Sequence, residues 1–267
     1  MAQSGSKRKR PRADQRLVSM GHAVTVERAR ALILAGRVFN GERRIDSAGQ
    51  AVALDAPLRV VQGRRYVGRG GDKLERALAD FGLDPAGLVV LDVGASTGGF
   101  TDCLLQQGAS KIYAVDVGRA QLANQLRADD RVISMERTNA RDAFPLPEAV
   151  DMLVADVSFI SLRAVLPTAM EHLKPGGLVL ALVKPQFEAE KGQVGRGGVV
   201  FDPRAHAAVV GSFCVWAVEQ SPPLQVIGIR RSRLEGDKGN REFFVLLKPE
   251  TGVTSPDSGQ KSAKIGC

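Results

Sequence analysis

Short apolar runs recur through residues 72–250, each separated from the next by a segment of helical pattern. The run at 88–93 reads Leu-Val-Val-Leu-Asp-Val, which is typical of a strand buried on both faces of a parallel sheet. Such strands alternating with helices predict an α/β domain with a mostly parallel sheet. We expect strands at 88–93, 111–117, 131–135, 151–155 and 178–183, and helices at 100–107, 120–127, 162–173 and 203–219.

The end of this domain breaks the alternation. Residues 224–230 and 242–247 both read as strands, and the segment 231–241 between them leaves no room for a crossover helix. Two strands joined in this way pair antiparallel. The sequence therefore predicts five parallel strands followed by a terminal antiparallel hairpin, a pattern that resembles the class I (Rossmann-like) methyltransferases.

A glycine-rich loop, Gly94-Ala-Ser96-Thr-Gly98-Gly99-Phe100, joins the first strand to the next helix. Glycines at such a place let the backbone approach a ligand, and the helix N-terminus offers unpaired N–H groups. The loop lacks the Gly-Lys-Ser/Thr end of a P-loop, and its spacing differs from the dinucleotide fingerprint G-x-G-x-x-G. From the loop alone, a tight turn without a ligand stays an alternative.

Acidic residues flank this loop. Asp92 precedes Gly94, and Asp116 ends the second strand, where an acid accepts hydrogen bonds from ribose hydroxyls in nucleotide folds. S-adenosylmethionine has a ribose and a cationic sulfonium but no pyrophosphate, so these acids suit it better than they suit phosphates. Asn139 and Asp142, after the third strand, are placed to meet its adenine. The predicted cofactor residues are Asp92, Gly94, Ser96, Gly98, Gly99, Phe100, Asp116, Asn139, Asp142 and Asp156.

Charged residues lie where the later strands end. Asp156 follows the fourth strand, Lys184 follows the fifth, and Glu242 begins the last, antiparallel strand. All three should therefore share the carboxyl-end edge, the usual ligand site of open α/β sheets. Lys73 follows Gly70-Gly71-Asp72 at the start of an amphipathic helix. Taken alone, Lys184 has a plain alternative as a snorkelling lysine, Glu242 as a solvated strand-end acid and Lys73 as a surface charge.

Together, Lys73, Asp156, Lys184 and Glu242 resemble the Lys–Asp–Lys–Glu tetrad of FtsJ-like RNA 2′-O-methyltransferases. Residues 12–249 as a whole resemble the TlyA family of ribosomal RNA methyltransferases, also called haemolysins. The motifs that carry this resemblance are Arg69-Gly-Gly-Asp-Lys73-Leu, Leu91-Asp-Val-Gly-Ala-Ser-Thr-Gly-Gly-Phe-Thr-Asp102, Asp156-Val-Ser-Phe-Ile-Ser-Leu, Val183-Lys-Pro-Gln-Phe-Glu188 and Lys238-Gly-Asn-Arg-Glu-Phe243. One departure is that Thr97-Gly98-Gly99-Phe100 stands where FtsJ-like enzymes carry Pro-Gly-Gly-Trp.

The resemblance implies methyl transfer from S-adenosylmethionine to a ribose 2′-hydroxyl of ribosomal RNA, at a cytidine. Such an enzyme positions the hydroxyl in line with the methyl group and removes one proton. Lys184 is then expected to act as general base or to steer the hydroxyl, and Lys73 to hold the ribose or its phosphate. Asp156 would orient Lys184 and face the sulfonium, and Glu242 would fix Lys73 or the hydroxyl.

The positive charge is concentrated at the front of the chain. Residues 1–67 contain 14 Lys and Arg against 5 Asp and Glu, a net of +9, whereas residues 68–267 contain 23 against 24, a net of −1. A basic face on a folded module suggests phosphate binding, and the scarcity of aromatics favours recognition of structured RNA by backbone and shape. The candidate RNA-binding residues are Arg12, Arg16, Arg28, Arg30, Arg37, Arg43, Arg44, Arg65 and Arg69.

Local signals divide this basic segment into helix, helix and hairpin. A helix at 12–20 ends at Gly21, Thr25 offers an N-cap oxygen to a second helix that Gly36 closes, and Asn40-Gly41 indicates a hairpin. Residues 51–61 look like another strand pair, interrupted at 55–57. The unit resembles an S4-like RNA-binding domain through Arg16-Leu17-Val18, Glu27-Arg28-Ala29-Arg30-Ala31-Leu32-Ile33 and Gly36-Arg37-Val38-Phe39-Asn40-Gly41.

The predicted organisation has five parts. They are a disordered basic N-terminus at 1–11, the S4-like domain at 12–61, a Gly/Arg linker at 62–71, the FtsJ-like methyltransferase domain at 72–250 and a disordered tail at 251–267. The oligomeric state cannot be predicted from these patterns.

Other function classes are disfavoured. No uncharged apolar run approaches the roughly 18 residues of a spanning helix, and no apolar core of a secretory signal follows the basic start. The three cysteines are an odd number without a CxxC, and the histidines are isolated, so we expect no disulfide, no metal and a cytoplasmic location. The alternatives are a non-catalytic RNA-binding or ribosome assembly factor, a membrane-active haemolysin, and a base or protein methyltransferase.

Overall fold

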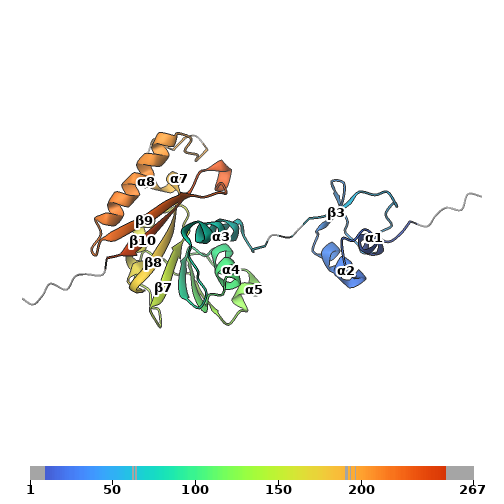
Figure 1. Cartoon of the computed structure of the whole chain (residues 1–267), viewed down its shortest axis with the longest axis horizontal. Coiled ribbons are helices and arrows are strands. Elements are labelled where there is room, and N and C mark those ends of the chain that lie inside the picture. The colour runs from blue at the N-terminus through green and yellow to red at the C-terminus, as the bar shows by residue number, and fades with distance from the viewer. Residues whose placement is uncertain are drawn as a thin grey trace, which may run out of the picture. The chain divides into compact units, whose positions relative to one another are not determined.

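The structure, a computed structural model, describes residues 10–250 except 62, 64, 190, 191, 193 and 196. The chain divides into two compact units, Met1–Arg64 and Arg65–Cys267, both drawn in Figure 1. The predicted disordered segments 1–11 and 251–267 lie outside the described residues, apart from residues 10 and 11. Among the described residues, no helix is long and apolar enough to cross a membrane.

The N-terminal unit is built from two helices and a small antiparallel sheet. Thr25 caps the second helix, because its Oγ1 accepts a hydrogen bond from the Arg28 N–H at 3.2 Å. The predicted hairpin forms around Gly41, which has a φ of +60°. The elements are α1 (Ala13–Ser19), α2 (Val26–Leu34), β1 (Val38–Asn40), β2 (Arg43–Arg44) and β3 (Leu58–Val60), with sheet order β2-β1-β3.

The strand pair predicted at 51–61 is wrong. Only β3 forms there, and it pairs with β1 rather than with a neighbour inside the segment. Ala51 makes an isolated bridge to Arg12 instead. Pro57 has no N–H to give to a ladder, so regular pairing begins only after it.

The second unit contains a seven-stranded sheet of order β6-β5-β4-β7-β8-β10-β9. The first five strands of this order are parallel, and β10 runs antiparallel to both β8 and β9. This confirms the predicted class I methyltransferase pattern with its terminal hairpin. The strands are β4 (Val89–Val93), β5 (Lys111–Asp116), β6 (Val132–Glu136), β7 (Val150–Ala155), β8 (Leu173–Val183), β9 (Leu224–Arg231) and β10 (Phe243–Pro249).

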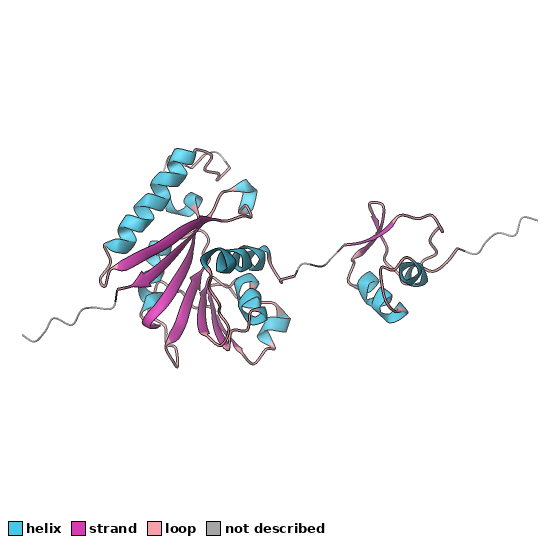
Figure 2. Ribbon diagram, viewed as in Figure 1, coloured by secondary structure: helices cyan, strands magenta, loops and turns pink. Residues whose placement is uncertain are grey.

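Helices cover both faces of this sheet (Figure 2). Leu74 of α3 and Leu104 of α4 belong to one apolar core, and Leu166 of α6 and Phe213 of α8 belong to the other. The strands are therefore buried on both sides, which explains their unbroken apolar runs. The helices are α3 (Arg69–Phe81), α4 (Gly99–Gln106), α5 (Asn124–Arg127), η1 (Leu162–Ala164), α6 (Leu166–Met170), α7 (Pro185–Glu188), α8 (Pro203–Val218) and η2 (Asp237–Gly239).

Two predicted helices are shorter than expected. Helix 120–127 shrinks to α5, because Ala120 has a φ of +52° and the Glu136 carboxylate accepts the N–H groups of Ala120, Gln121 and Leu122. Helix 162–173 divides into η1 and α6, since Pro167 sits in the first turn of a new helix.

The predicted linker 62–71 is also too long. Tyr66 is only 2% exposed and packs in the core of the second unit, and α3 begins at Arg69. A Cβ on Gly71 would overlap the Tyr66 side chain, so this glycine lets α3 lie against the ring. Arg65 and Arg69 therefore belong to the sheet-containing unit.

Candidate active site

The glycine loop between β4 and α4 lies against the backbone that leaves β7. Gly94 has a φ of +85°, and a Cβ built on it would stand 2.5 Å from the carbonyl oxygen of Asp156. Only glycine permits both the left-handed conformation and this approach. The glycine at position 94 thus brings the loop that follows β4 next to Asp156, the first residue after β7.

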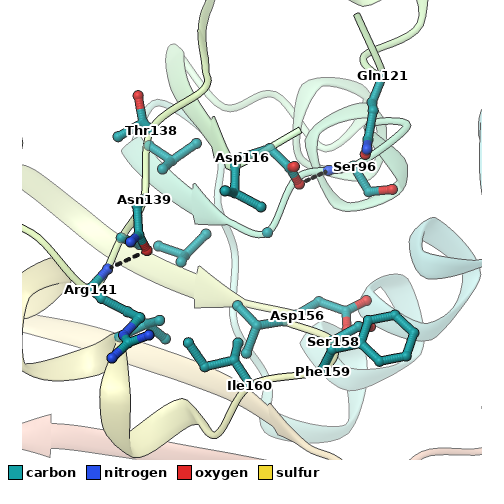
Figure 3. Close-up of a pocket in the computed structure, with 17 residues that line it drawn as sticks. Ser96, Asp116, Gln121, Thr138, Asn139, Arg141, Asp156, Ser158, Phe159 and Ile160 are labelled. Carbon is teal, nitrogen blue, oxygen red and sulfur yellow. Dashed lines mark hydrogen bonds between the residues drawn. The ribbon is translucent and has the colours of Figure 1, made fainter. Parts of the chain in front are cut away.

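A pocket of about 620 Å³ opens beside this contact, at the carboxyl edge of the sheet. Its size lies within the range of roughly 300–1,000 Å³ that is usual for small-molecule sites. In Figure 3, Asp116 and Ser96 lie on one side, and Asp156, Ser158 and Phe159 lie on the other. Five of the predicted cofactor residues line it, namely Gly94, Ser96, Asp116, Asn139 and Asp156.

The Asp116 carboxylate is held in place by backbone N–H groups. Its Oδ2 accepts from Ser96 at 2.8 Å and its Oδ1 from Gly118 at 2.6 Å. A carboxylate oxygen has two lone pairs, so each oxygen keeps one for a ligand hydroxyl. Asn139 is fixed likewise, because its Oδ1 accepts from the Arg141 N–H at 3.2 Å, as Figure 3 shows.

Five of the predicted cofactor residues do not line this pocket. The Asp142 side chain points to Asn139 and accepts a hydrogen bond at Oδ2 from the Asn139 Nδ2, at 2.9 Å. Gly98 has a φ of +95° and faces Leu122 and Leu126, so it serves the fold of the loop. Gly99 and Phe100 line a smaller pocket of about 180 Å³.

The fifth, Asp92, is fully buried. Its Oδ2 accepts a hydrogen bond from the Thr101 Oγ1 at 2.6 Å, and its Oδ1 has no partner among the described groups. Burial raises the pKa of Asp92 to about 7, and the negative charges of Asp156 and Asp116 add to this rise. Asp92 lines neither the large pocket nor the small one, so the geometry of the site gives no support to the predicted contact of Asp92 with the cofactor.

The four tetrad residues form two ion pairs at the same edge. Lys184 Nζ lies 2.6 Å from Asp156 Oδ1 and donates to Ser158 Oγ at 2.8 Å. Lys73 Nζ donates to Glu242 Oε2 at 2.5 Å. Burial raises the pKa of Glu242, and the nearby positive charges of Lys73 and Lys184 oppose this rise. The resemblance implies the Lys184–Asp156 pairing, and the Lys73–Glu242 pairing is one of the two roles that it leaves open for Glu242.

These ion pairs connect two cavities. Lys73, Lys184 and Glu242 line a second pocket of about 410 Å³, and Ser158 lines both this pocket and the large one. The small pocket lies between them, since Asp156, Ser158 and Lys184 all contribute to its wall. A ligand in the large pocket and a ligand in the second would both reach Ser158, beside the Lys184–Asp156 pair, an arrangement suited to transfer of a group between them.

Several pocket residues were not predicted. Ser158 belongs to the motif Asp156-Val-Ser158, but nothing in its spacing marks it as the partner of Lys184. Phe159, Gln186 and Phe187 line the second pocket and come from the same two segments as Asp156 and Lys184. In the sequence, only their position next to Asp156 and Lys184 could have indicated that they lie at the site.

The predicted RNA-binding arginines fall into different environments. Arg12 and Arg30 both bind the buried Asp14, at 2.9 and 3.1 Å, and Arg16 donates to the Leu54 carbonyl. Arg44 pairs with Asp46, Arg65 pairs with Glu75, and Arg69 lines the second pocket. Arg28 and Arg43 are exposed, Arg37 is half-buried, and none of these three forms an ion pair with a described residue.

Residues 66–249 match the model of the FtsJ-like methyltransferase family. The chain belongs to this family. An FtsJ-like assignment agrees with the sheet order and with the Lys–Asp–Lys–Glu geometry at the sheet edge.

Relatives of this FtsJ-like chain match it over nearly its whole length. It is 44% identical, over 96% of both chains, to "16S/23S rRNA (cytidine-2'-O)-methyltransferase TlyA" of Mycobacterium tuberculosis (strain CDC 1551 / Oshkosh). It is 45% identical to "Putative rRNA methyltransferase YqxC" of Bacillus subtilis (strain 168), over 90% of this chain and 86% of the relative. Among solved structures, "Putative hemolysin from Streptococcus thermophilus" has a TM-score of 0.68 and 41% identity, covering 90% of this chain and 89% of that one.

Proposed function

We propose that this chain transfers a methyl group from S-adenosylmethionine to the 2′-hydroxyl of a cytidine in ribosomal RNA. The observation that carries the proposal is the ion pair of 2.6 Å between Lys184, which lines the second pocket, and Asp156, which lines the large one. The names of the relatives, at 44 and 45% identity, support the class of RNA and the nucleotide. Such relatives also favour action in the cytoplasm.

The large pocket suits S-adenosylmethionine. The carboxylates of Asp116 and Asp156 line it, which favours a cationic sulfonium and disfavours a pyrophosphate. Gly94 and Asp156 both line this pocket, and the missing Cβ of Gly94 is what allows the two backbone segments to approach each other there. Asp116 would hold the ribose hydroxyls, and Asn139 would meet the adenine. The bound cofactor supplies an activated methyl group.

The second pocket suits the RNA sugar. Lys184 would steer the 2′-hydroxyl toward the methyl group, and its neutral form would accept the hydroxyl proton. Asp156 and Ser158 fix the position of the Lys184 Nζ. Lys73 would hold the ribose or its phosphate, and Glu242 keeps the Lys73 Nζ in place through their 2.5 Å hydrogen bond.

The N-terminal unit is assigned the task of holding RNA. Its S4-like pattern and the net charge of +9 over residues 1–67 support this role. Arg28, Arg37 and Arg43 are the best candidates for phosphate contacts, because no described acid neutralises them. Arg12 and Arg30 contribute mainly through Asp14 to the fold of the unit.

Substitution of Lys184 tests the proposal. Lys184→Ala should lower the methyl-transfer rate on ribosomal RNA by about 10²–10⁴-fold, the usual contribution of a proton-transfer residue, with S-adenosylmethionine affinity nearly unchanged. Lys174→Ala is the matched control. Lys174 lies at the start of β8, at the sheet edge opposite to the site, and it also pairs with an aspartate, Asp151. The assay is transfer of labelled methyl groups, followed by mapping of 2′-O-methylated nucleotides.

Other outcomes identify the rival functions. Near-normal turnover by Lys184→Ala would remove Lys184 from the mechanism. A wild-type chain that binds RNA but neither binds S-adenosylmethionine nor methylates would be a non-catalytic RNA-binding factor. Lysis of liposomes by the pure chain, without cofactor or RNA, would support the membrane-active alternative.

A further inference from the structure

Two segments that carry tetrad residues run alongside each other at the catalytic edge. One is 156–162, which runs from the end of β7 to the first residue of η1, and the other is Lys184 with helix α7 (Pro185–Glu188). They are joined at three successive places. Lys184 contacts Asp156 and Ser158 at one end, the rings of Phe187 and Phe159 lie 5.1 Å apart in the middle, and Glu188 binds the other end.

Glu188 makes the third of these contacts with both of its carboxylate oxygens. Oε2 accepts a hydrogen bond from Ser161 Oγ at 2.6 Å, and Oε1 accepts from the Leu162 N–H at 2.6 Å. The Glu188 side chain is only 2% exposed, and Arg163 Nε lies 3.8 Å away. Burial raises the pKa of Glu188, and the two donors and Arg163 oppose the rise. A nearly buried acid with two short bonds fixes its partners closely.

The strand-to-helix segment that Glu188 binds contains a strained residue. Phe159 has a φ of +65°, which is unfavourable for a side chain with a Cβ. Its side chain is 91% exposed, so its own burial does not hold this conformation. Strain of this kind persists only when the surroundings fix the backbone on both sides. Lys184 holds the chain on the N-terminal side of Phe159 through Ser158. Glu188 holds it on the C-terminal side through Ser161 and Leu162.

We propose that Glu188 is a positioning residue for methyl transfer: it holds segment 156–162 against α7, and so keeps Asp156 and Ser158 in register with the Lys184 Nζ. This inference rests on the proposed function, because it assumes that Lys184 acts on the hydroxyl. Glu188 lines neither the large nor the second pocket, so it acts through other residues rather than on a ligand. Displacements of about 1 Å at a reacting group cost on the order of 10²-fold in rate.

The experiment compares Glu188→Gln with wild type in the full-length chain. Glutamine keeps the volume but cannot accept at both oxygens. We expect the single-turnover rate to fall at least tenfold, with S-adenosylmethionine affinity within about twofold of wild type. Hydrogen exchange should become faster in the peptide covering 157–163, including the Leu162 amide. Ser161→Ala removes one of the two bonds and should lower the rate by less, and the double variant should be no slower than Glu188→Gln alone.

Val209→Ala is the matched control for stability. Val209 is a buried residue of α8 in the same core, away from both pockets. It should lower the melting temperature but leave the rate and exchange at 157–163 unchanged. A Glu188→Gln rate equal to wild type, or a loss no greater than that of a control with the same stability, overturns the positioning role. If Glu188→Gln does not fold, a wild-type rate in Ser161→Ala overturns it.

Failure of the proposed function would be seen separately. In that case the wild-type chain itself would not methylate ribosomal RNA, whatever residue stands at 188. The exchange comparison would still report whether Glu188 holds segment 156–162. Unchanged exchange in Glu188→Gln would then overturn the inference on its own.

Discussion

Removal of the ionisable group at Asp92 should change how the stability of the second unit, which contains the seven-stranded sheet, depends on pH. The carboxyl is fully buried beneath the glycine loop, and its pKa rises from 3.8 to about 7 in the folded chain. Between these two values the folded chain binds the proton and the unfolded chain does not. Stability from this group is therefore complete below pH 3.8 and is lost as pH rises toward 7.

The magnitude follows from the size of the shift. A rise of about 3 units corresponds to roughly 4 kcal/mol in total, at about 1.4 kcal/mol per unit. Between pH 5 and pH 8 the unfolded carboxyl is already ionised, so about 3 kcal/mol of this loss falls in the measurable range. Asp92→Asn keeps an acceptor for the Thr101 hydroxyl but cannot ionise. Its unfolding free energy should therefore fall by about 3 kcal/mol less than that of wild type over this range.

Urea unfolding followed by tryptophan fluorescence measures this difference. The single tryptophan, Trp216, lies in α8 and reports on unfolding of the second unit. Other titrating groups are common to both proteins, so they cancel when the two pH profiles are subtracted. Thr101→Val is a control of opposite sign, because loss of its hydrogen bond raises the pKa of Asp92 further and extends the loss to higher pH. Parallel profiles for wild type and Asp92→Asn would refute the reasoning.

Two further sets of substitutions test the roles proposed for the glycine loop and for the N-terminal unit. Gly94→Ala should lower S-adenosylmethionine affinity more than tenfold, because its Cβ would displace the Asp156 carbonyl, whereas Gly82→Ala, with a φ of +65° and open space around it, should cost only about 1–2 kcal/mol of stability. Calorimetric titration and thermal unfolding measure the two effects, and equal affinity in both variants would contradict the first. Arg28→Ala and Arg43→Ala should each reduce the slope of log affinity for RNA against log salt by about 1, while Arg30→Ala, which loses a bond to the buried Asp14, should destabilise the N-terminal unit by about 1–2 kcal/mol. Filter binding at several salt concentrations measures the slopes, and an unchanged slope in both surface variants would place the RNA surface elsewhere.

The sheet and the edge that carries the tetrad could be predicted from the sequence. Alternating apolar runs fix which segments are strands, and the short connection before Glu242 fixes that the last strand is antiparallel. These two facts bring Asp156, Lys184 and Glu242 to one edge without any knowledge of packing. Lys73 reaches the same edge from α3, and its pairing with Glu242 followed only from the resemblance to FtsJ-like enzymes.

Other features depended on side-chain direction, which periodicity does not give. Asp92 lies in β4, close to the glycine loop in the sequence. Because β4 is buried on both faces, this position does not expose its carboxylate to the pocket. Gly98 and Gly94 look alike in the sequence, but one faces leucines and the other faces a backbone carbonyl. Glu188 looks like a surface acid of a short helix, and only the three-dimensional approach of 156–162 to α7 gives it its two donors.

The charges at the site and at the front of the chain imply a separation of binding from chemistry. Lys73 and Lys184 are each paired with a carboxylate, so the tetrad has no net formal charge with which to attract a polyanion. The attraction must come from arginines that have no carboxylate partner. Arg12, Arg30, Arg44 and Arg65 have such partners, so in the described part of the basic segment the positive charge without a carboxylate partner lies on residues such as Arg28 and Arg43. Salt should then weaken RNA binding at the N-terminal unit much more than it slows methyl transfer on bound RNA, since the ion pairs of the tetrad are largely buried and poorly screened.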